Sequence, residues 1–347
     1  MANAVIDKFF SVLRYATGQF HRDFNALAKE RPVTVVLCYH RVTADQPPGF
    51  TDIEAGVLAD VFEAQMRFML AHFRPIRATE ALADNSPGLR FAVTFDDGTR
   101  DNLEIAGPIL KRLGIPATFF VVSDFVSTDR PYWWEELAAL MRQSDQPAVD
   151  LHAAVSEVGR CPWPSARVAD LSSAPSRLAA TEDVAAHIRS SNPAALNAMM
   201  DAVAGTLGIP RRPVGRAYPL MDWDDLRELG DQGHDIGLHT ATHPNLALAD
   251  PACLEAELVG AAHHIEKELG SAPTSFAFPY GIVRDTDEKV SEILSAQTKV
   301  TVGFGTGPGL ITEDSSQFIL PRCLLNGQRS MVWAHNLMKA KASTSSL

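Results

Sequence analysis

Short apolar runs alternate with amphipathic segments along most of the chain. The apolar runs are almost continuously hydrophobic, which is typical of parallel strands covered on both faces. The predicted strands are residues 33–39, 89–95, 117–122, 235–238, 274–278, 300–304 and 318–321. Apolar residues recur at helical spacing between them, and the predicted helices are residues 57–73, 101–113, 222–231, 251–269 and 286–294. This alternation predicts an α/β fold with a parallel sheet, as in a barrel wrapped by helices.

Three segments depart from this rhythm. Residues 1–30 repeat apolar side chains at spacings of three and four, which predicts an amphipathic helix that packs on its own domain or on another subunit. The alternative for this helix is an anchor at a membrane surface. Residues 143–217 are rich in Pro, Ala and Ser and predict an insertion, a helical or irregular subdomain that covers the active site as a lid. Residues 331–347 predict a C-terminal helix and tail, which leaves 31–330 as the main domain.

Composition and charge narrow the class of protein. The formal net charge is −11 and Lys and Arg form no cluster, which argues against a nucleic-acid partner. Asp7 and Lys8 interrupt the apolar residues that a secretory signal would need, and no run has the length of a membrane span. The expected location is therefore cytoplasmic or peripheral to a membrane. The widely spaced cysteines predict reduced, buried thiols: Cys38, Cys161, Cys253 and Cys323.

A pair of carboxylates follows one predicted strand. Asp96 and Asp97 come directly after residues 89–95 and precede Gly98. In barrels of parallel strands, catalytic groups lie at the carboxyl ends of the strands. Asp-Asp-Gly is also a common turn, so this string alone leaves both interpretations open.

Two histidines follow another predicted strand. His239 and His243 come after residues 235–238, and a spacing of four places two imidazoles on one side of a helical turn. The alternative is one core and one surface histidine. Together with Asp97 they make three ligands for a divalent ion, with Asp96 as a spare carboxylate, which indicates a hydrolase. The remaining histidines considered are assigned to structural or solvated positions: His234, His263 and His264.

The ligand set does not select one metal. Zinc is favoured, while cobalt, nickel and manganese also accept two imidazoles and one carboxylate. Iron in an oxygenase shares the same ligands, and the spare Asp96 favours hydrolysis instead.

These motifs resemble those of the polysaccharide deacetylase family, also called the NodB-homology or carbohydrate esterase 4 group, over most of residues 31–322. The strings are Thr-Phe-Asp-Asp-Gly at 94–98 and His-Thr-x-x-His-Pro at 239–244. The resemblance implies a distorted (β/α)7 barrel and metal-dependent removal of acetyl groups from sugars. It implies that Asp96 is the general base and that Asp97, His239 and His243 are the metal ligands.

The third motif of the family is altered in this chain. It reads Ala-Phe-Pro-Tyr-Gly at 277–281, with Ala277 where an arginine is expected. We hypothesise that Arg322, after the last predicted strand, reaches Asp96 in its place. The resemblance further implies that the backbone N–H of Tyr280, positioned by Pro279 and Gly281, binds the oxyanion of the reaction.

The late histidine of the family is absent, so another group has to protonate the leaving amine. His40 ends the first predicted strand, and the first and last strands of a closed barrel are neighbours. His40 is therefore the candidate general acid, as in exopolysaccharide-modifying members that carry an early Tyr-His pair. The alternative is that it anchors the junction of strand and loop.

The expected activity is removal of acetyl groups from an N-acetylated carbohydrate, either a polysaccharide, an oligosaccharide or a lipid-linked or nucleotide-linked precursor. Two alternatives stay open: an inactive carbohydrate-binding protein of the same fold, and a hydrolase of a cyclic amide. The aromatic residues before the insertion are interpreted as sugar-stacking or core residues: Tyr132, Trp133 and Trp134.

Overall fold

The computed structural model describes residues 22, 25–26, 28–29, 32–45, 56–83, 86–151, 155, 168–211, 216, 218–281, 287–307, 309–312 and 315–325. Most of the predicted N-terminal helix, residues 331–347 and Cys161 lie outside this set. The predictions made for them stay predictions. No helix within the described ranges is both long enough and apolar enough to span a membrane.

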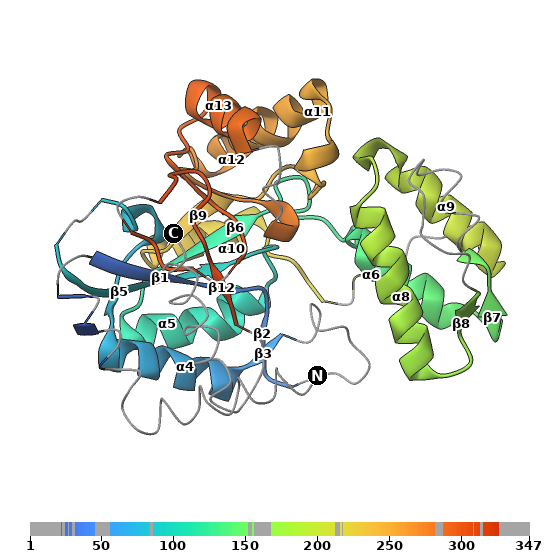
Figure 1. Cartoon of the computed structure of the whole chain (residues 1–347), viewed down its shortest axis with the longest axis horizontal. Helices are drawn as coiled ribbons and strands as arrows, with labels where there is room; N and C mark the ends of the chain where they lie inside the picture. Colours follow the sequence, from blue (N-terminus) through green and yellow to red (C-terminus); the bar gives the residue numbers. More distant parts are fainter. Residues whose placement is uncertain are drawn as a thin grey trace.

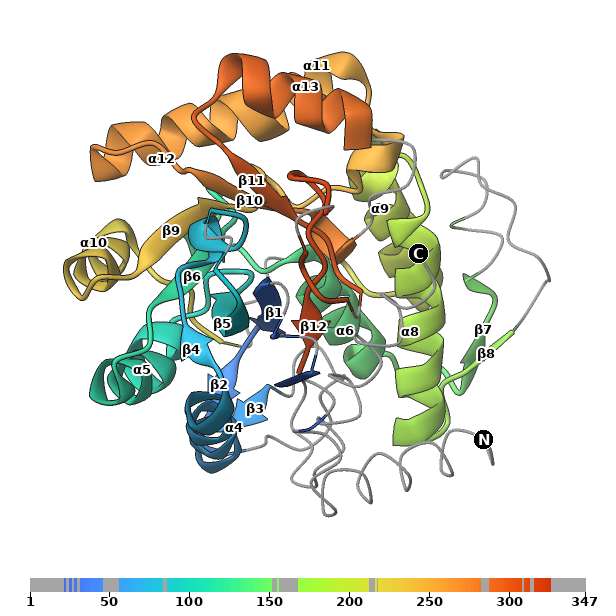
Figure 2. The same cartoon turned by 60° about the vertical axis from the view of Figure 1, so that its left-hand side comes forward.

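A curled parallel sheet forms the centre of the main domain (Figure 2). Its strands are β1 (Pro32–Tyr39), β4 (Arg74–Pro75), β5 (Gly88–Phe95), β6 (Ala117–Val121), β9 (Asp235–Leu238), β10 (Ser275–Ala277), β11 (Val302–Phe304) and β12 (Cys323–Leu324). They are ordered β11-β10-β9-β6-β5-β1-β12, and β4 pairs with β5. Leu320 pairs with Phe304 of β11 while β12 pairs with β1, so the last segment joins the two ends of the sheet. The fold is the predicted distorted α/β barrel.

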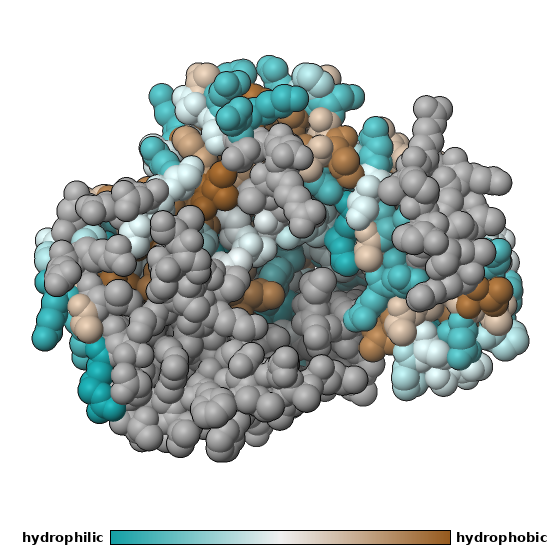
Figure 3. All heavy atoms as spheres, in the orientation of Figure 1, coloured by the Kyte–Doolittle hydropathy of each residue, from teal (hydrophilic) through white to brown (hydrophobic). Residues whose placement is uncertain are grey.

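The helices lie around the outside of this sheet (Figure 2). They are α4 (Ala59–His72), η2 (Asn102–Ala106), α5 (Gly107–Leu113), α10 (Trp223–Asp231), α11 (Pro251–Glu255), η5 (Ala256–Gly260), α12 (Ala261–Leu269) and α13 (Asp287–Gln297). Short turns of helix occur at η1 (Ala78–Glu80), η4 (Leu246–Leu248) and η6 (Pro279–Gly281). In Figure 3 the outer surface at the top, over α12 and α13, is mainly hydrophilic. The buried faces of α12 and α13 belong to the main hydrophobic core. In this core the rings of Phe95 and Phe119 stack with 4.8 Å between their centroids.

Several element boundaries differ from the sequence prediction, and two of the differences have a clear structural cause. The segment expected as a strand at 318–321 makes only an isolated bridge, from Leu320 to Phe304 of β11, and regular pairing starts at Cys323, where β12 pairs with β1. The change of partner falls at Pro321, which has no N–H to donate to either strand. The helix expected from residue 57 starts at Ala59, because Val57–Leu58 forms β3, which pairs with β2 (Val42–Thr43).

The inserted segment folds as a compact helical unit beside the barrel (Figure 1). It contains α6 (Trp133–Gln143), β7 (Ala148–Val149), β8 (Ala169–Asp170), α8 (Ala174–Arg189), η3 (Pro193–Ala195) and α9 (Leu196–Leu207). Leu137, Met141, Val184 and Met200 belong to its own buried hydrophobic cluster. The unit begins with α6, earlier than the change of composition at residue 143.

Candidate active site

Four residues at the carboxyl end of the sheet adopt left-handed backbone conformations although none is glycine. Asp97, Thr240, His243 and Tyr280 have φ angles of 71°, 67°, 63° and 58°. Such conformations are uncommon for residues with a Cβ and concentrate at functional sites. Asp97 follows β5, Thr240 and His243 follow β9, and Tyr280 follows β10, so neighbouring strands deliver all four to one place.

Asp97, His239 and His243 come together as a cluster of potential metal ligands. Their ligand atoms lie within 4.8 Å of one another. Asp97 Oδ1 is 3.6 Å from His239 Nε2 and 3.5 Å from His243 Nε2. This buried oxygen has no hydrogen-bond partner among the described residues. Oxygen and imidazole nitrogen at this spacing are donors that suit a divalent cation, so the residues present fit a metal.

The second coordination sphere also favours metal binding. His239 Nδ1 donates to the carbonyl oxygen of Ala277 at 2.8 Å, in the tautomer that leaves the Nε2 lone pair directed at the cluster. Burial lowers the pKa of His243, and the nearby charge of His239 acts in the same direction. Both effects favour the neutral imidazole, which is the form that binds metals.

The two histidines are carried by a loop, so the expectation of a helical turn is wrong. Residues 239–243 follow β9 without helical structure. The backbone N–H groups of Ala241 and Thr242 donate to the Glu257 carboxylate at 2.9 and 2.8 Å. The Thr242 hydroxyl donates to the same carboxylate at 2.6 Å. Glu257 therefore sets the loop geometry from η5, a π-helical segment. Sequence reasoning missed this role, because Glu257 lies in a predicted helix rich in charged residues.

Asp96 is paired with Arg322. Arg322 Nη1 and Nη2 donate to Asp96 Oδ1 and Oδ2 at 2.7 and 2.8 Å. The guanidinium is fully buried and also donates to the carbonyl oxygen of Gly305 at 3.0 Å. Burial opposes ionisation of Asp96, but the Arg322 charge and its two hydrogen bonds hold the carboxyl pKa well below its usual range. Arg322 thus contacts Asp96, the carboxylate that was expected to lose a partner because Ala277 replaces the family arginine.

His40 follows β1 and is half-buried, and a charge on its ring lowers the pKa of both Asp96 and Asp97. Burial raises the pKa of Asp97, and the charge of His40 is the largest opposing influence. The backbone of His40 is fixed by Asn102, whose side-chain amide donates to the His40 carbonyl at 2.9 Å.

The third motif lies against the second. Ala277 is buried and supplies the carbonyl that fixes His239. The Tyr280 ring packs perpendicular to the His243 ring at 4.6 Å. Gly281 has a φ of 64°, and a Cβ there would lie 1.5 Å from Thr306 Oγ1, so only glycine fits.

Tyr132 and the first two residues of α6, Trp133 and Trp134, pack next to the site. The Tyr132 hydroxyl donates to the backbone carbonyl of Asp97 at 2.8 Å, and Tyr132 stacks on Trp134 at 4.4 Å. Trp133 is buried in the core of the inserted unit. Tyr132 and Trp133 are therefore packed inside the protein, and sugar stacking stays a prediction.

The three histidines that the sequence assigned to structural or solvated positions are not part of this cluster. His234 is buried and accepts a hydrogen bond from the Ala117 N–H through Nδ1 at 3.2 Å, while burial lowers its pKa to about 4. His264 lies on α12, where Nδ1 is 3.4 Å from Asp124. His263 is exposed on the same helix.

Comparison with known proteins agrees with this geometry. The family model for polysaccharide deacetylases matches residues 84–298. A polysaccharide deacetylase from Bacillus cereus is similar in structure with a TM-score of 0.55 at 17% identity, over 88% of this chain and 69% of that one. The Streptococcus pyogenes deacetylase PplD, solved in complex with acetate, has a TM-score of 0.54 at 17% identity, over 89% of this chain and 98% of that one. IcaB from Ammonifex degensii has a TM-score of 0.52 at 18% identity, over 89% of this chain and 97% of that one.

No curated protein sequence matches the chain. The structural neighbours are too distant in sequence to establish more than the fold. The family model, however, covers more than half of the chain and includes the aspartate pair and both histidines. The chain therefore belongs to the polysaccharide deacetylase family.

Proposed function

We propose that this protein is a metal-dependent N-deacetylase that releases acetate from N-acetylated sugars. The observation that supports the proposal is that two adjacent carboxylates have different surroundings. Asp97 faces two imidazoles with an unpartnered oxygen, while Asp96 is held as an anion by Arg322. One carboxylate is thus available to bind a cation and the other to accept a proton.

Asp97, His239 and His243 would hold the cation, which when bound polarises an amide carbonyl and lowers the pKa of a coordinated water. Asp96 accepts the proton of the attacking water as general base. The backbone N–H of Tyr280, with Pro279 shaping the turn, donates to the oxyanion that develops on the acetyl group. His40 protonates the departing amine as general acid. Arg322 keeps Asp96 ionised and fixes its orientation.

Zinc is the proposed metal because imidazole and carboxylate suit it, and cobalt, nickel or manganese would fit the same ligands. The proposed substrate is an N-acetylhexosamine in a polysaccharide, an oligosaccharide or a lipid-linked precursor. Deacetylation turns a neutral amide into an amine that is cationic at neutral pH. The net charge of −11 is compatible with such a product.

The position of Arg322 weakens the case for an inactive binding protein. That alternative depended on Ala277 replacing the family arginine and on the missing late histidine. A buried guanidinium contacts both oxygens of Asp96 from the segment just before β12, so the carboxylate keeps a cationic partner.

Acetate release from N-acetylglucosamine oligomers, measured with and without a chelator, tests the proposed function. We expect release that the chelator abolishes and that added Zn²⁺ or Co²⁺ restores. His239→Ala removes one imidazole ligand and is expected to lower both bound metal and acetate release by at least about 100-fold. Metal is measured by elemental analysis of the purified protein. Release that is insensitive to the chelator and to His239→Ala would contradict the proposal.

His40→Gln tests the proposed general acid. Loss of a proton donor that acts in the transition state is expected to lower kcat by about 100-fold or more. Metal content is expected to stay at the wild-type level, because His40 is not among the clustered ligands. A variant that loses its metal, or one that keeps wild-type kcat, would assign His40 to another role.

A further inference from the structure

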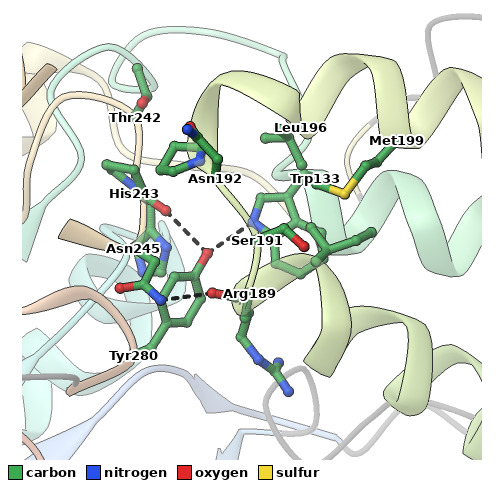
Figure 4. Close-up of a pocket in the computed structure, with 13 residues that line it drawn as sticks. Trp133, Arg189, Ser191, Asn192, Leu196, Met199, Thr242, His243, Asn245 and Tyr280 are labelled. Carbon is green, nitrogen blue, oxygen red and sulfur yellow. Dashed lines mark hydrogen bonds between the residues drawn. The ribbon is translucent and has the colours of Figure 1, made fainter. Parts of the chain in front are cut away.

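The inserted helical unit contacts the catalytic face of the barrel through Trp133, the first residue of α6. Its indole Nε1 donates to the Tyr280 hydroxyl at 2.9 Å. The same hydroxyl donates to the backbone carbonyl of His243 at 3.1 Å. Figure 4 shows both bonds meeting at the Tyr280 hydroxyl. A continuous chain of hydrogen bonds thus connects the insertion, the third motif and the loop that carries the histidines.

Tyr280 adopts a backbone conformation that needs support. Its φ and ψ angles are 58° and 3°, in a region that residues with a Cβ rarely occupy. A tyrosine hydroxyl is protonated at neutral pH, so it donates to the His243 carbonyl while it accepts from the Trp133 indole. Bonds on both sides of the hydroxyl fix the ring, and the ring fixes the backbone from which it extends.

The cavity that Trp133 and Tyr280 line together is too small for a typical ligand, and the larger cavity of about 560 Å³ that Trp133 also lines does not include Tyr280. The smaller cavity has a volume of about 60 Å³ and is lined by Trp133, Asn245 and Tyr280 among others. Pockets for small ligands typically have volumes of roughly 300–1,000 Å³. A second hydrogen bond crosses the same junction, from Asn245 Nδ2 to the carbonyl oxygen of Arg189 at the end of α8, at 2.7 Å. The junction is therefore a contact between two folded units.

We infer that Trp133 is a positioning residue for deacetylation. Its indole N–H holds the Tyr280 side chain, and thereby keeps the Tyr280 backbone N–H directed at the reacting carbonyl. Donors that stabilise a transition state have to be oriented before the reaction begins, so a small rotation of Tyr280 lowers the rate. This inference rests on the proposed function. It assigns to the insertion a part in catalysis that is separate from covering the site.

The test compares variants in the acetate-release assay with the metal-loaded full chain. Trp133→Phe removes the indole N–H and keeps an aromatic ring; we expect kcat to fall about tenfold, the loss typical of one hydrogen bond, with KM and metal content unchanged. Tyr280→Phe is expected to lower kcat at least as far. Adding Trp133→Phe to Tyr280→Phe should cause no further loss of kcat, because the hydroxyl through which Trp133 acts is already gone.

Asn245→Asp is the matched control. It removes the amide donor to Arg189 and keeps the oxygen that accepts from the Ala247 N–H at 3.1 Å. We expect it to weaken the docking of the insertion, seen as faster proteolysis between the units, while kcat stays within about twofold of wild type. A decrease in kcat equal to that of Trp133→Phe would show that docking in general matters, and would overturn the specific role of Trp133.

The inference would also be overturned if Trp133→Phe kept wild-type kcat. The same holds if the losses of kcat in Trp133→Phe and Tyr280→Phe added up fully in the double variant. If Trp133→Phe fails to fold, Tyr280→Phe is sufficient as a test, because it keeps both the aromatic ring at 280 and the Trp133 indole. Wild-type kcat in Tyr280→Phe would then refute the role of the Tyr280 hydroxyl in positioning. A wild-type protein that releases no acetate from any oligomer would instead refute the proposed function, and the inference with it.

Discussion

Replacing Asp96 with Asn is expected to lower kcat for acetate release by about 10²- to 10⁴-fold, the range typical of losing a general base. Asn has nearly the same shape as Asp and cannot accept a proton from water at neutral pH. The metal content is expected to stay unchanged, because the clustered ligand atoms belong to Asp97, His239 and His243. Turnover under saturating substrate, together with elemental analysis of the same preparation, measures both quantities.

Asp97→Asn is the matched comparison, since it makes the same chemical change at the neighbouring position. It removes the anionic ligand, so activity and bound metal should fall together, and excess metal should restore part of the activity. If Asp96→Asn lost its metal and Asp97→Asn kept it, the two carboxylates would have exchanged roles. If Asp96→Asn kept wild-type kcat, another group would be the base.

Replacing Arg322 with Met is expected to destabilise the protein by about 3–5 kcal/mol at pH 7, because it leaves the buried Asp96 carboxylate without its cationic partner. The free energy of unfolding in urea measures this loss. With Arg322 present, the folded-state pKa of Asp96 lies below the unfolded value, so the pair contributes stability above about pH 4, and that stability is lost as pH falls through the folded-state pKa.

In Arg322→Met the shift of the Asp96 pKa between the unfolded and folded states changes sign. Burial is the largest influence that remains on Asp96, and it raises the pKa. The variant should therefore recover stability relative to wild type as the pH is lowered and Asp96 takes up a proton. The acid limb of its kcat/KM profile should move to higher pH, since the ionised base forms only there.

The double variant Asp96→Asn with Arg322→Met separates this account from simple loss of packing. Removing both charges should restore part of the stability lost in Arg322→Met, because no unpaired carboxylate is left in the interior. A double variant that is less stable than wild type by the sum of the two single losses would show that the two residues are not coupled. An unchanged acid limb in Arg322→Met would show that Arg322 does not tune the base.

Local patterns were sufficient to predict the sheet and the central cluster. The strands that carry the site contain apolar runs, and the Asp96–Asp97 pair and His239 directly follow two of them. Because parallel strands end at the same edge of a sheet, position along the chain translates into proximity. The family motifs added the assignment of Asp96 and Asp97 to different roles, which periodicity alone does not distinguish.

The supporting contacts were harder to predict because they depend on tertiary packing. Glu257 lies in a helix whose sequence looks solvent-exposed, and only the approach of residues 241–242 gives its carboxylate three donors. The hydroxyl of Tyr280 meets Trp133 across 147 positions of sequence. The histidine pair was found for a reason that turned out to be wrong, since spacing by four suggested a helical turn and the structure has a loop.

Arg322 lies 226 positions after Asp96 and just before β12, the strand that docks against the first strand of the barrel. During synthesis the chain therefore completes every proposed metal ligand well before it supplies the cation that pairs with Asp96. A growing polypeptide that has already folded its earlier strands would hold this carboxylate without its partner until the segment around Arg322 emerges and inserts. The order of translation thus makes the ion pair one of the later steps of assembly.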